Sequence, residues 1–205
     1  MRGRLIAVEG LDGVGKTTLS RSLAASIGAR WMTTPGASIR AMRGVFDAAF
    51  LASPCARSLA YAATVLAAGA EARDALNAGI DVVFDRYWLS TVVYAPPELW
   101  PGLEALAPLV PPAALTLYVA VPEALRRARL EGRGGLSAAD QQTLEPGRGY
   151  WLDQRFRAQR GGVVAGNFQV LPGEDSPGDV LARAVCALAG HAGQQDLFAS
   201  RARAS

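Results

Sequence analysis

The segment that most constrains this chain begins at residue 10, where Gly10-Leu-Asp-Gly-Val-Gly-Lys16-Thr17 matches the pattern G-x-x-x-x-G-K-[ST]. The apolar run Arg4–Glu9 precedes it, and Lys16–Ile27, with apolar residues at helical spacing, follows it. This is the strand–loop–helix context that the pattern requires. Glycines let successive backbone N–H groups turn toward phosphate oxygens, and the helix start adds partial positive charge. The sequence therefore predicts a loop that binds the phosphates of a nucleoside triphosphate.

Within this loop, Lys16 differs in residue type from every other basic residue of the chain. The sequence has 21 Lys and Arg residues, and Lys16 is the only lysine. Because a flexible ammonium group can follow a phosphoryl group during transfer, we expect Lys16 to be catalytic, at the β- and γ-phosphates of ATP. Thr17 is expected to ligate Mg²⁺. The ATP-binding residues predicted here are Gly10, Gly13, Val14, Gly15, Lys16, Thr17 and Thr18.

Short apolar runs alternate with segments of helical periodicity along the rest of the chain. The further predicted strands are Arg30–Thr34, Ile80–Asp85, Leu115–Ala120 and Asn167–Leu171. The further predicted helices are Ala37–Phe50, Arg57–Ala78, Pro122–Leu130 and Pro177–Ala189, with a polar segment over Ser137–Gln159 that Pro146-Gly147 interrupts. Since parallel strands need crossover connections, this order predicts an α/β three-layer sandwich with a five-stranded parallel sheet and helices on both faces. With the loop above, this is the P-loop NTPase architecture.

Composition excludes several classes of protein. Half of the residues are apolar and 19% are charged, which is enough for a sizeable core and unlike a disordered chain. The formal charge of +3 is far from that of a nucleic-acid binder, and no apolar run approaches the ~18 residues of a membrane helix. Cys55 and Cys186 have no metal-binding spacing and are expected to be small buried residues in a reducing compartment. We therefore expect a cytoplasmic protein that binds neither nucleic acid nor membrane.

Acidic residues stand near the predicted phosphate loop. Glu9 ends the first strand, Asp12 lies inside the loop, and Asp85-Arg86 ends the strand Ile80–Asp85. An aspartate after an apolar strand is the second metal-side element of a P-loop enzyme, and an arginine beside it offers a bidentate phosphate contact. We therefore expect Asp85 in the Mg²⁺ site, partly through water, and Arg86 at a phosphate.

The order and spacing of these motifs resemble those of the thymidylate kinase family. The resemblance rests on Glu9–Thr18, on Pro35-Gly36, on Tyr61-Ala-Ala63, and on Asp85-Arg-Tyr-Trp-Leu-Ser-Thr-Val-Val-Tyr94. The segment Leu115–Glu123, followed by an Arg-rich stretch, is also similar. The resemblance covers roughly residues 4 to 190.

This resemblance implies a kinase that transfers the γ-phosphate of ATP to dTMP or a similar nucleoside monophosphate. Asp12 would approach the metal and the transferred phosphate, and Arg86 would hold the acceptor phosphate. Arg126, Arg127, Arg129 and Arg133 would begin an Arg-rich lid, about residues 126–149, with Arg129 and Arg133 catalytic. Ser90, Thr91 and Tyr94 would line the deoxyribose and base side of the acceptor site. The resemblance also implies a homodimer.

The chain departs from the family in the acceptor half. The family's Arg-Glu-Pro-Gly is Thr33-Thr34-Pro35-Gly36 here, and its arginine after Tyr-Ala-Ala is Thr64. Arg40 and Arg43, on the helix after Pro35, are candidates to replace the lost positive charge, and Tyr61 and Thr64 complete the predicted acceptor site. Among the tryptophans, Trp88 is the one in a position to stack on a base.

These departures leave two other functions open. One is a kinase of the same fold that phosphorylates an unphosphorylated nucleoside or another small metabolite, which the neutral Thr34 and Thr64 favour. The other is a P-loop ATPase or switch without a small acceptor. We expect one domain over residues 1–190 and a flexible tail over 191–205.

Overall fold

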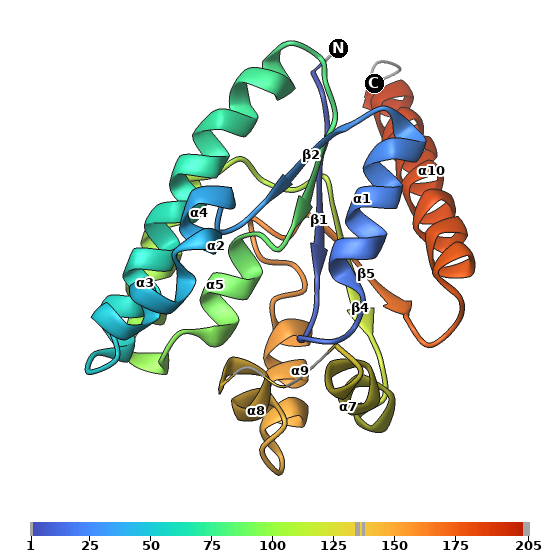
Figure 1. The fold of residues 1–205 in the computed structure, drawn as a ribbon. Helices are drawn as coiled ribbons and strands as arrows, with labels where there is room; N and C mark the ends of the chain where they lie inside the picture. Colours follow the sequence, from blue (N-terminus) through green and yellow to red (C-terminus); the bar gives the residue numbers. More distant parts are fainter. Residues whose placement is uncertain (1, 134–135, 137, 203–205) are drawn as a thin grey trace.

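The computed structural model describes residues 2–133, 136 and 138–202. Within them, five parallel strands form one sheet in the order β2-β3-β1-β4-β5 (Figure 1). The strands are β1 (Leu5–Glu9), β2 (Arg30–Thr33), β3 (Val82–Asp85), β4 (Leu115–Ala120) and β5 (Asn167–Pro172). All five predicted strands are thus confirmed, and so is the parallel sheet.

The central strand β1 shows why these runs become strands. It lies between β3 and β4, and all five of its residues are buried. Leu5 and Ala7 pack into the hydrophobic core on one face of the sheet, and Ile6 and Val8 pack into the core on the other. A parallel strand that is buried on both faces requires the continuous apolar run that the sequence has there.

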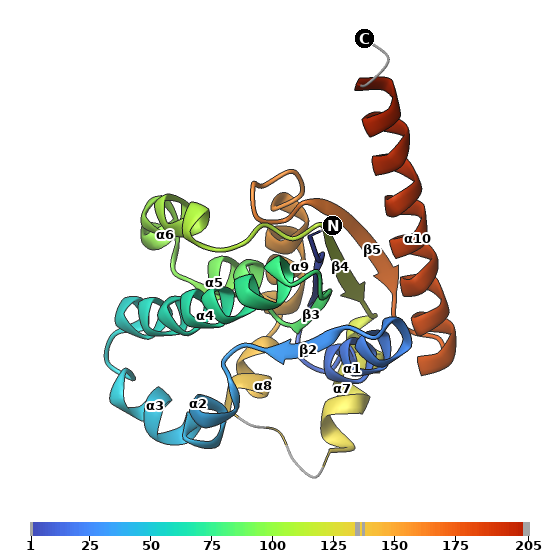
Figure 2. The same cartoon turned by 90° about the horizontal axis from the view of Figure 1, so that it is seen from above.

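Helices cover both faces of the sheet. In Figures 1 and 2, α1 (Lys16–Ile27) and α10 (Pro177–Ala202) lie on one side. On the other side lie α4 (Pro54–Asn77), α5 (Trp88–Tyr94) beside it, and α6 (Trp100–Leu106). This is the predicted three-layer arrangement.

The remaining helices are short and lie toward the carboxyl ends of the strands, as Figure 1 shows. They are α2 (Ala37–Ala41), α3 (Arg43–Ala49), α7 (Glu123–Glu131), α8 (Ala138–Thr143) and α9 (Arg148–Ala158). Two 3₁₀ turns, η1 (Pro97–Leu99) and η2 (Ala107–Leu109), stand before and after α6 in the chain. The register places Asp85 beside Val8 on one side and beside Thr33 on the other. The loops after β1, β2 and β3 therefore meet at one rim, where ligands of open parallel sheets bind.

Some helix boundaries differ from the sequence expectation. The predicted helix Ala37–Phe50 is two helices that meet at Met42, where nearby Gly44 lowers helix propensity. The helix expected over Arg57–Ala78 begins at Pro54 because the Ser53 hydroxyl caps it, accepting from the Ala56 N–H at 3.2 Å. The last helix does not end near Ala189 but continues to Ala202.

The structure tests the predictions made for the two cysteines and for membrane-spanning helices. Cys186 is exposed and Cys55 half-buried, so the expectation that both are buried is wrong; both are free thiols. In the part of the chain that the structure describes, no helix combines the length and apolarity that crossing a membrane takes.

Candidate active site

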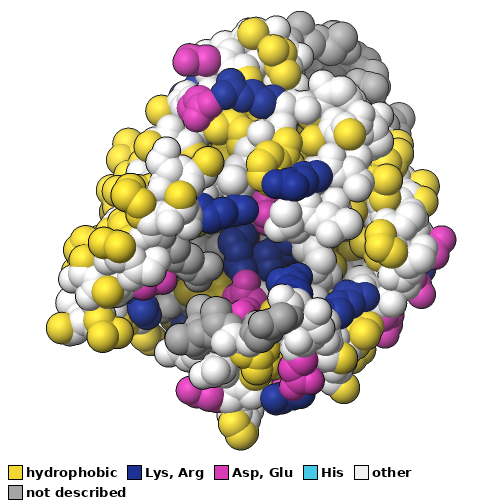
Figure 3. All heavy atoms as spheres, viewed as in Figure 1, with side chains coloured by type: hydrophobic (Ala, Val, Ile, Leu, Met, Phe, Trp, Pro, Cys, Tyr) yellow, Lys and Arg dark blue, Asp and Glu magenta, His cyan; other side chains and the backbone are white. Residues whose placement is uncertain are grey.

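A cavity of about 590 Å³ opens at the rim where the strands end. Figure 3 shows this face hollowed, with Lys and Arg side chains gathered in the hollow. Fifteen of the predicted site residues line the cavity: Asp12, Gly13, Gly15, Lys16, Thr17, Thr18, Arg40, Tyr61, Thr64, Asp85, Arg86, Ser90, Thr91, Tyr94 and Arg133. The fold thus brings the predicted donor and acceptor residues to one cavity.

Three predicted residues that the structure describes in full are not among those that line it. Gly10 and Val14 belong to the loop but lie outside the lining, and Arg129 donates instead to the carbonyl of Val14 at 3.4 Å. Arg43 begins α3, and its side chain lies outside what the structure describes.

The loop between β1 and α1 depends on glycine at two places. Gly13 has φ of 86°, and a Cβ there would lie 2.9 Å from the carbonyl oxygen of Arg126. Gly15, the N-cap of α1, has φ of 97°. Residues with a side chain rarely adopt this left-handed backbone conformation. Glycine at these two positions therefore allows the loop to turn directly into the helix.

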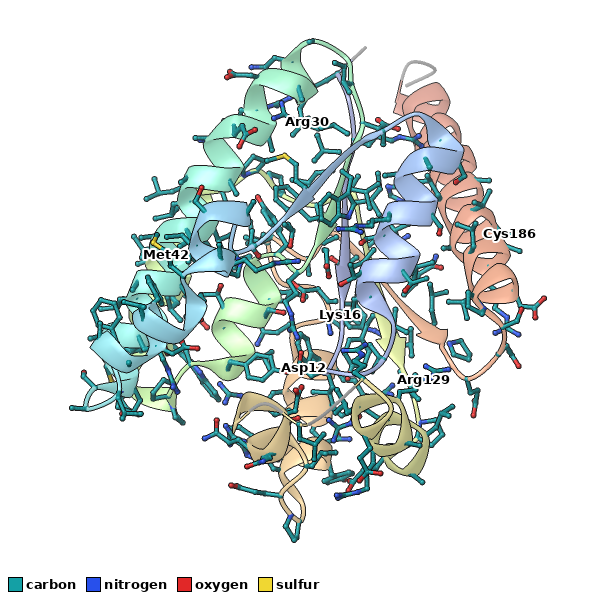
Figure 4. All side chains as sticks on the ribbon, viewed as in Figure 1. Asp12, Lys16, Arg30, Met42, Arg129 and Cys186 are labelled. Atoms are coloured by element: carbon teal, nitrogen blue, oxygen red, sulfur yellow. The ribbon has the colours of Figure 1, made fainter. Side chains whose placement is uncertain are left out.

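Lys16 is held inside the loop (Figure 4). Its side chain is buried, and Nζ donates to the carbonyl oxygen of Leu11 at 2.5 Å. Burial, together with the charge of Arg86, lowers the pKa of Lys16 to about 7, against the opposing carboxylates of Asp12 and Asp85. A phosphate beside this group would favour its charged form.

Thr17 and Asp85 lie together at the end of the sheet. The Thr17 hydroxyl donates to Asp85 Oδ2 at 2.6 Å, and Arg40 Nη2 lies 3.9 Å from the same oxygen. Arg40 also donates to the Thr33 hydroxyl. Hydroxyl and carboxylate oxygens are the ligands that Mg²⁺ prefers, and it usually takes only one or two protein carboxylates beside phosphates and water. The residues present therefore fit a magnesium ion held with ATP.

Arg86 and Asp12 form an ion pair across the site. Arg86 also donates to the Ser90 hydroxyl at 3.3 Å. Burial opposes its charge, but the Asp12 carboxylate, followed by the Tyr94 hydroxyl and the carboxylates of Glu9 and Asp85, raises its pKa. Its backbone has φ of 65°, an uncommon value for a non-glycine residue. Such strained conformations cluster at functional sites, where the surrounding structure holds them.

Glu9 has a positioning role that the sequence did not indicate. It is fully buried and accepts from the backbone N–H of Tyr87 at 2.9 Å, from that of Ser90 at 3.1 Å, and from the Ser90 hydroxyl at 2.5 Å. Burial raises its pKa, although the hydrogen bonds from Ser90 oppose this. Since these N–H groups lie at the start of α5, the carboxylate ties that helix to the end of β1.

The two threonines at the departures from the family make local contacts. Thr34 donates to the carbonyl oxygen of Arg86 at 3.0 Å, and Thr64 donates to that of Tyr61 at 2.7 Å. The Tyr61 hydroxyl donates to Asp47 at 2.8 Å. Both threonines thus support the wall of the cavity.

Arginines at the start of the predicted lid bind other parts of the protein. Arg126 is buried and donates to the carbonyl and hydroxyl oxygens of Thr143 at 2.8 and 3.1 Å. Arg127 donates to the Leu144 carbonyl at 3.2 Å. These two therefore join α7 to the last residue of α8 and to the residue after it, while Arg133 lines the cavity.

Sequence reasoning missed a group on α9. Arg148, Trp151 and Arg155 line the cavity, as does Arg57 of α4. Their i, i+3, i+7 spacing on a helix is a signal that could have placed the three on one face. The expectation that Trp88 stacks on a base is wrong, because this residue is only 2% exposed and lies in the core. Trp151 is the tryptophan that lines the cavity.

Comparisons with known proteins agree on one family. The profile described as "Thymidylate kinase" matches residues 8–148. A thymidylate kinase from Cereibacter sphaeroides is 31% identical over 225 aligned positions that cover 92% of this chain and 95% of the relative.

Solved structures show the same fold. The thymidylate kinase of Candida albicans superposes with a TM-score of 0.70 at 19% identity, covering 92% of each chain. A deoxyadenosine kinase from M. mycoides superposes with a TM-score of 0.63 at 16% identity, covering 91% of this chain and 99% of that one. The phosphate loop, the parallel sheet and these matches together show that the chain belongs to the thymidylate kinase family and is an ATP-dependent nucleotide kinase.

Proposed function

We propose that the protein transfers the γ-phosphate of ATP to the phosphate group of a nucleoside monophosphate, dTMP being the first to test. The observation that carries this proposal is that Lys16 and Arg86 line the same cavity. One cation serves the triphosphate and the other the acceptor phosphate, so a single cavity can align both groups for transfer.

Thr17 and Asp85 would hold Mg²⁺ with the phosphates of ATP, and the ion would supply positive charge beside the transferring group. Lys16 leaves the Leu11 carbonyl and contacts the β- and γ-phosphates. Asp12 shares Arg86 with the acceptor phosphate and keeps the guanidinium oriented. Arg133, and Arg129 once it leaves Val14, add positive charge as the lid closes.

The carboxylates favour a phosphate acceptor over a hydroxyl acceptor. A hydroxyl must lose its proton to a base, and three carboxylates belong to residues that line the cavity. Asp12 pairs with Arg86, Asp85 accepts from Thr17, and Asp47 accepts from Tyr61. A phosphate acceptor needs no such base at neutral pH.

An assay of ADP release over a panel of nucleosides and nucleoside monophosphates tests the proposal. Turnover with dTMP or another monophosphate supports it. Turnover only with unphosphorylated acceptors indicates a nucleoside kinase, and acceptor-independent hydrolysis indicates an ATPase. The variant Lys16→Met should lose about 100-fold or more in kcat while it stays folded.

The variant Arg86→Gln distinguishes the binding of the acceptor from the binding of ATP. It should raise the KM of the acceptor by about tenfold or more and leave the KM of ATP nearly unchanged, because a charged hydrogen bond to the acceptor phosphate is lost. Arg30→Gln is the matched control, since Arg30 pairs with Glu71 away from the cavity (Figure 4). Equal changes in both KM values would contradict the assignment of Arg86.

A further inference from the structure

Two buried polar atoms at the cavity lack a partner. Among the described residues, Tyr94 Oη and Arg155 Nη1 are the buried side-chain nitrogen and oxygen atoms without a hydrogen bond, and both residues line this cavity. Proteins rarely leave a buried donor unpaired, because desolvation is then uncompensated. The charge of Arg86 acts on the Tyr94 hydroxyl, so Arg155 Nη1 is the donor for which a substrate can supply the partner.

Arg155 is held in a fixed orientation. Its guanidinium lies between two indole rings, 4.2 Å from the centroid of Trp100 and 4.2 Å from that of Trp151. Nη2 donates to the carbonyl oxygens of Val92 at 3.1 Å and Ala95 at 2.9 Å, at the carboxyl end of α5. The second terminal nitrogen, Nη1, is therefore pre-oriented as a donor.

The charge of Arg155 persists at neutral pH. Burial and the neighbouring Arg148 lower its pKa to about 10, which still leaves the guanidinium protonated. It therefore offers N–H donors and no acceptor.

The position of Arg155 relative to Arg86 fits the length of a nucleotide. Arg86 precedes α5, and Arg155 contacts its far end. Seven helical residues span about 10 Å, so a monophosphate held at Arg86 is long enough for its base to reach Arg155. Trp151, which is 38% exposed, adds a flat ring to the same wall.

Resting on the proposed function, we propose that Arg155 is a specificity-determining residue that donates a hydrogen bond from Nη1 to a keto oxygen of the acceptor base, with Trp151 lining the site for the ring. The base is thus recognised from α9, whereas α4 presents the neutral Thr64. A donor-only guanidinium favours bases with a keto oxygen on the recognised edge, and it disfavours bases with an exocyclic amino group there.

The ratio of kcat/KM for dUMP to that for dCMP tests this inference, because dUMP has a keto oxygen on its base where dCMP has an amino group. The wild-type protein should favour dUMP by about tenfold or more. Arg155→Met should bring the ratio to within about threefold and leave the KM of ATP unchanged. Arg160→Met is the control, because Arg160 packs over Phe168 outside the cavity, and its ratio should match the wild type.

Thermal melts identify the variants that fold. If Arg155→Met does not fold, Arg155→Gln replaces it; glutamine donates and accepts, so it should raise relative turnover with dCMP. A variant in which kcat/KM falls equally for both acceptors shows that Arg155 has a structural role only, and this result overturns the inference. A wild-type preference for dCMP also overturns it, whether or not any variant folds. Absence of turnover with every monophosphate instead overturns the proposed function, and the inference with it.

Discussion

At the residue scale, the site combines buried cations with carboxylates that keep them oriented. Lys16 donates to the Leu11 carbonyl, and Arg86 pairs with Asp12. In the proposed function, phosphate oxygens replace these two partners, so substrate binding would exchange one contact for another. Because the cations are already in place, little reorganisation is needed when charge develops during transfer.

Lys16 should make ATP binding depend on pH. With a pKa of about 7, the group is mostly neutral at about pH 8 in the free protein. Phosphate oxygens stabilise the ammonium and raise its pKa, so binding at about pH 8 should take up close to one proton per ATP. Calorimetry in two buffers with different ionisation enthalpies measures this uptake.

Lys16→Met provides the control, since it has no amine to protonate and should show no uptake. A wild-type heat of binding that does not vary with the buffer would contradict the assignment.

At the element scale, α5 connects the two halves of the site. Its start is tied to β1 through Glu9, and its end is tied to α9 through Arg155. The helix has only seven residues, too few for stability on its own, so its position depends on these contacts and on packing. Ser90, Thr91 and Tyr94 are therefore placed by residues far away in the sequence.

Removing the Glu9 carboxylate should loosen this helix. Glu9→Ala leaves the buried N–H groups of Tyr87 and Ser90 without an acceptor, at a cost of about 1–3 kcal/mol in the free energy of unfolding. The KM of the acceptor should rise more than that of ATP. Glu9→Gln, which keeps one carbonyl oxygen, should lie between Glu9→Ala and the wild type.

Urea unfolding and steady-state kinetics measure these effects. Glu71→Ala, at an exposed ion pair with Arg30, is the control and should change neither. Wild-type stability and kinetics in Glu9→Ala would show that packing alone positions α5.

At the scale of the whole molecule, α10 completes one face of the sandwich. Val180, Ala184 and Leu188 are buried in the core, one helical turn apart, against elements that include α1 and β5. Figure 2 shows the carboxyl end of α10 extending away from the sheet. The first half of this helix therefore contributes to the core that stabilises the fold.

Deletion of residues 192–205 should change Tm by no more than about 2 °C, because it leaves in place Val180, Ala184, Leu188 and His191, the buried residues that the structure describes on α10. Leu188→Ala, by contrast, should cost about 2–5 kcal/mol, since Leu188 is 4% exposed and its loss leaves a cavity. Differential scanning calorimetry compares the two. A deletion that unfolds the protein would show that the last turns of α10 carry essential contacts.

Patterns in short segments of the sequence predicted much of this protein. The phosphate loop, the five strands and Asp85-Arg86 follow from local patterns, because glycine spacing and apolar runs encode the backbone directly. The same patterns brought Lys16, Thr17 and Asp85, which line the cavity, into the predicted site. The family was identified from the same segments.

Only the tertiary structure decided which distant side chains meet. Asp12 and Arg86 pair across 74 residues of sequence, and Arg155 contacts α5 from 60 residues away. No periodicity encodes such pairs, since they depend on how α9 and α5 pack at the end of the sheet. Local sequence patterns thus determined the loop proposed to bind ATP, and packing determined the walls of the proposed acceptor site.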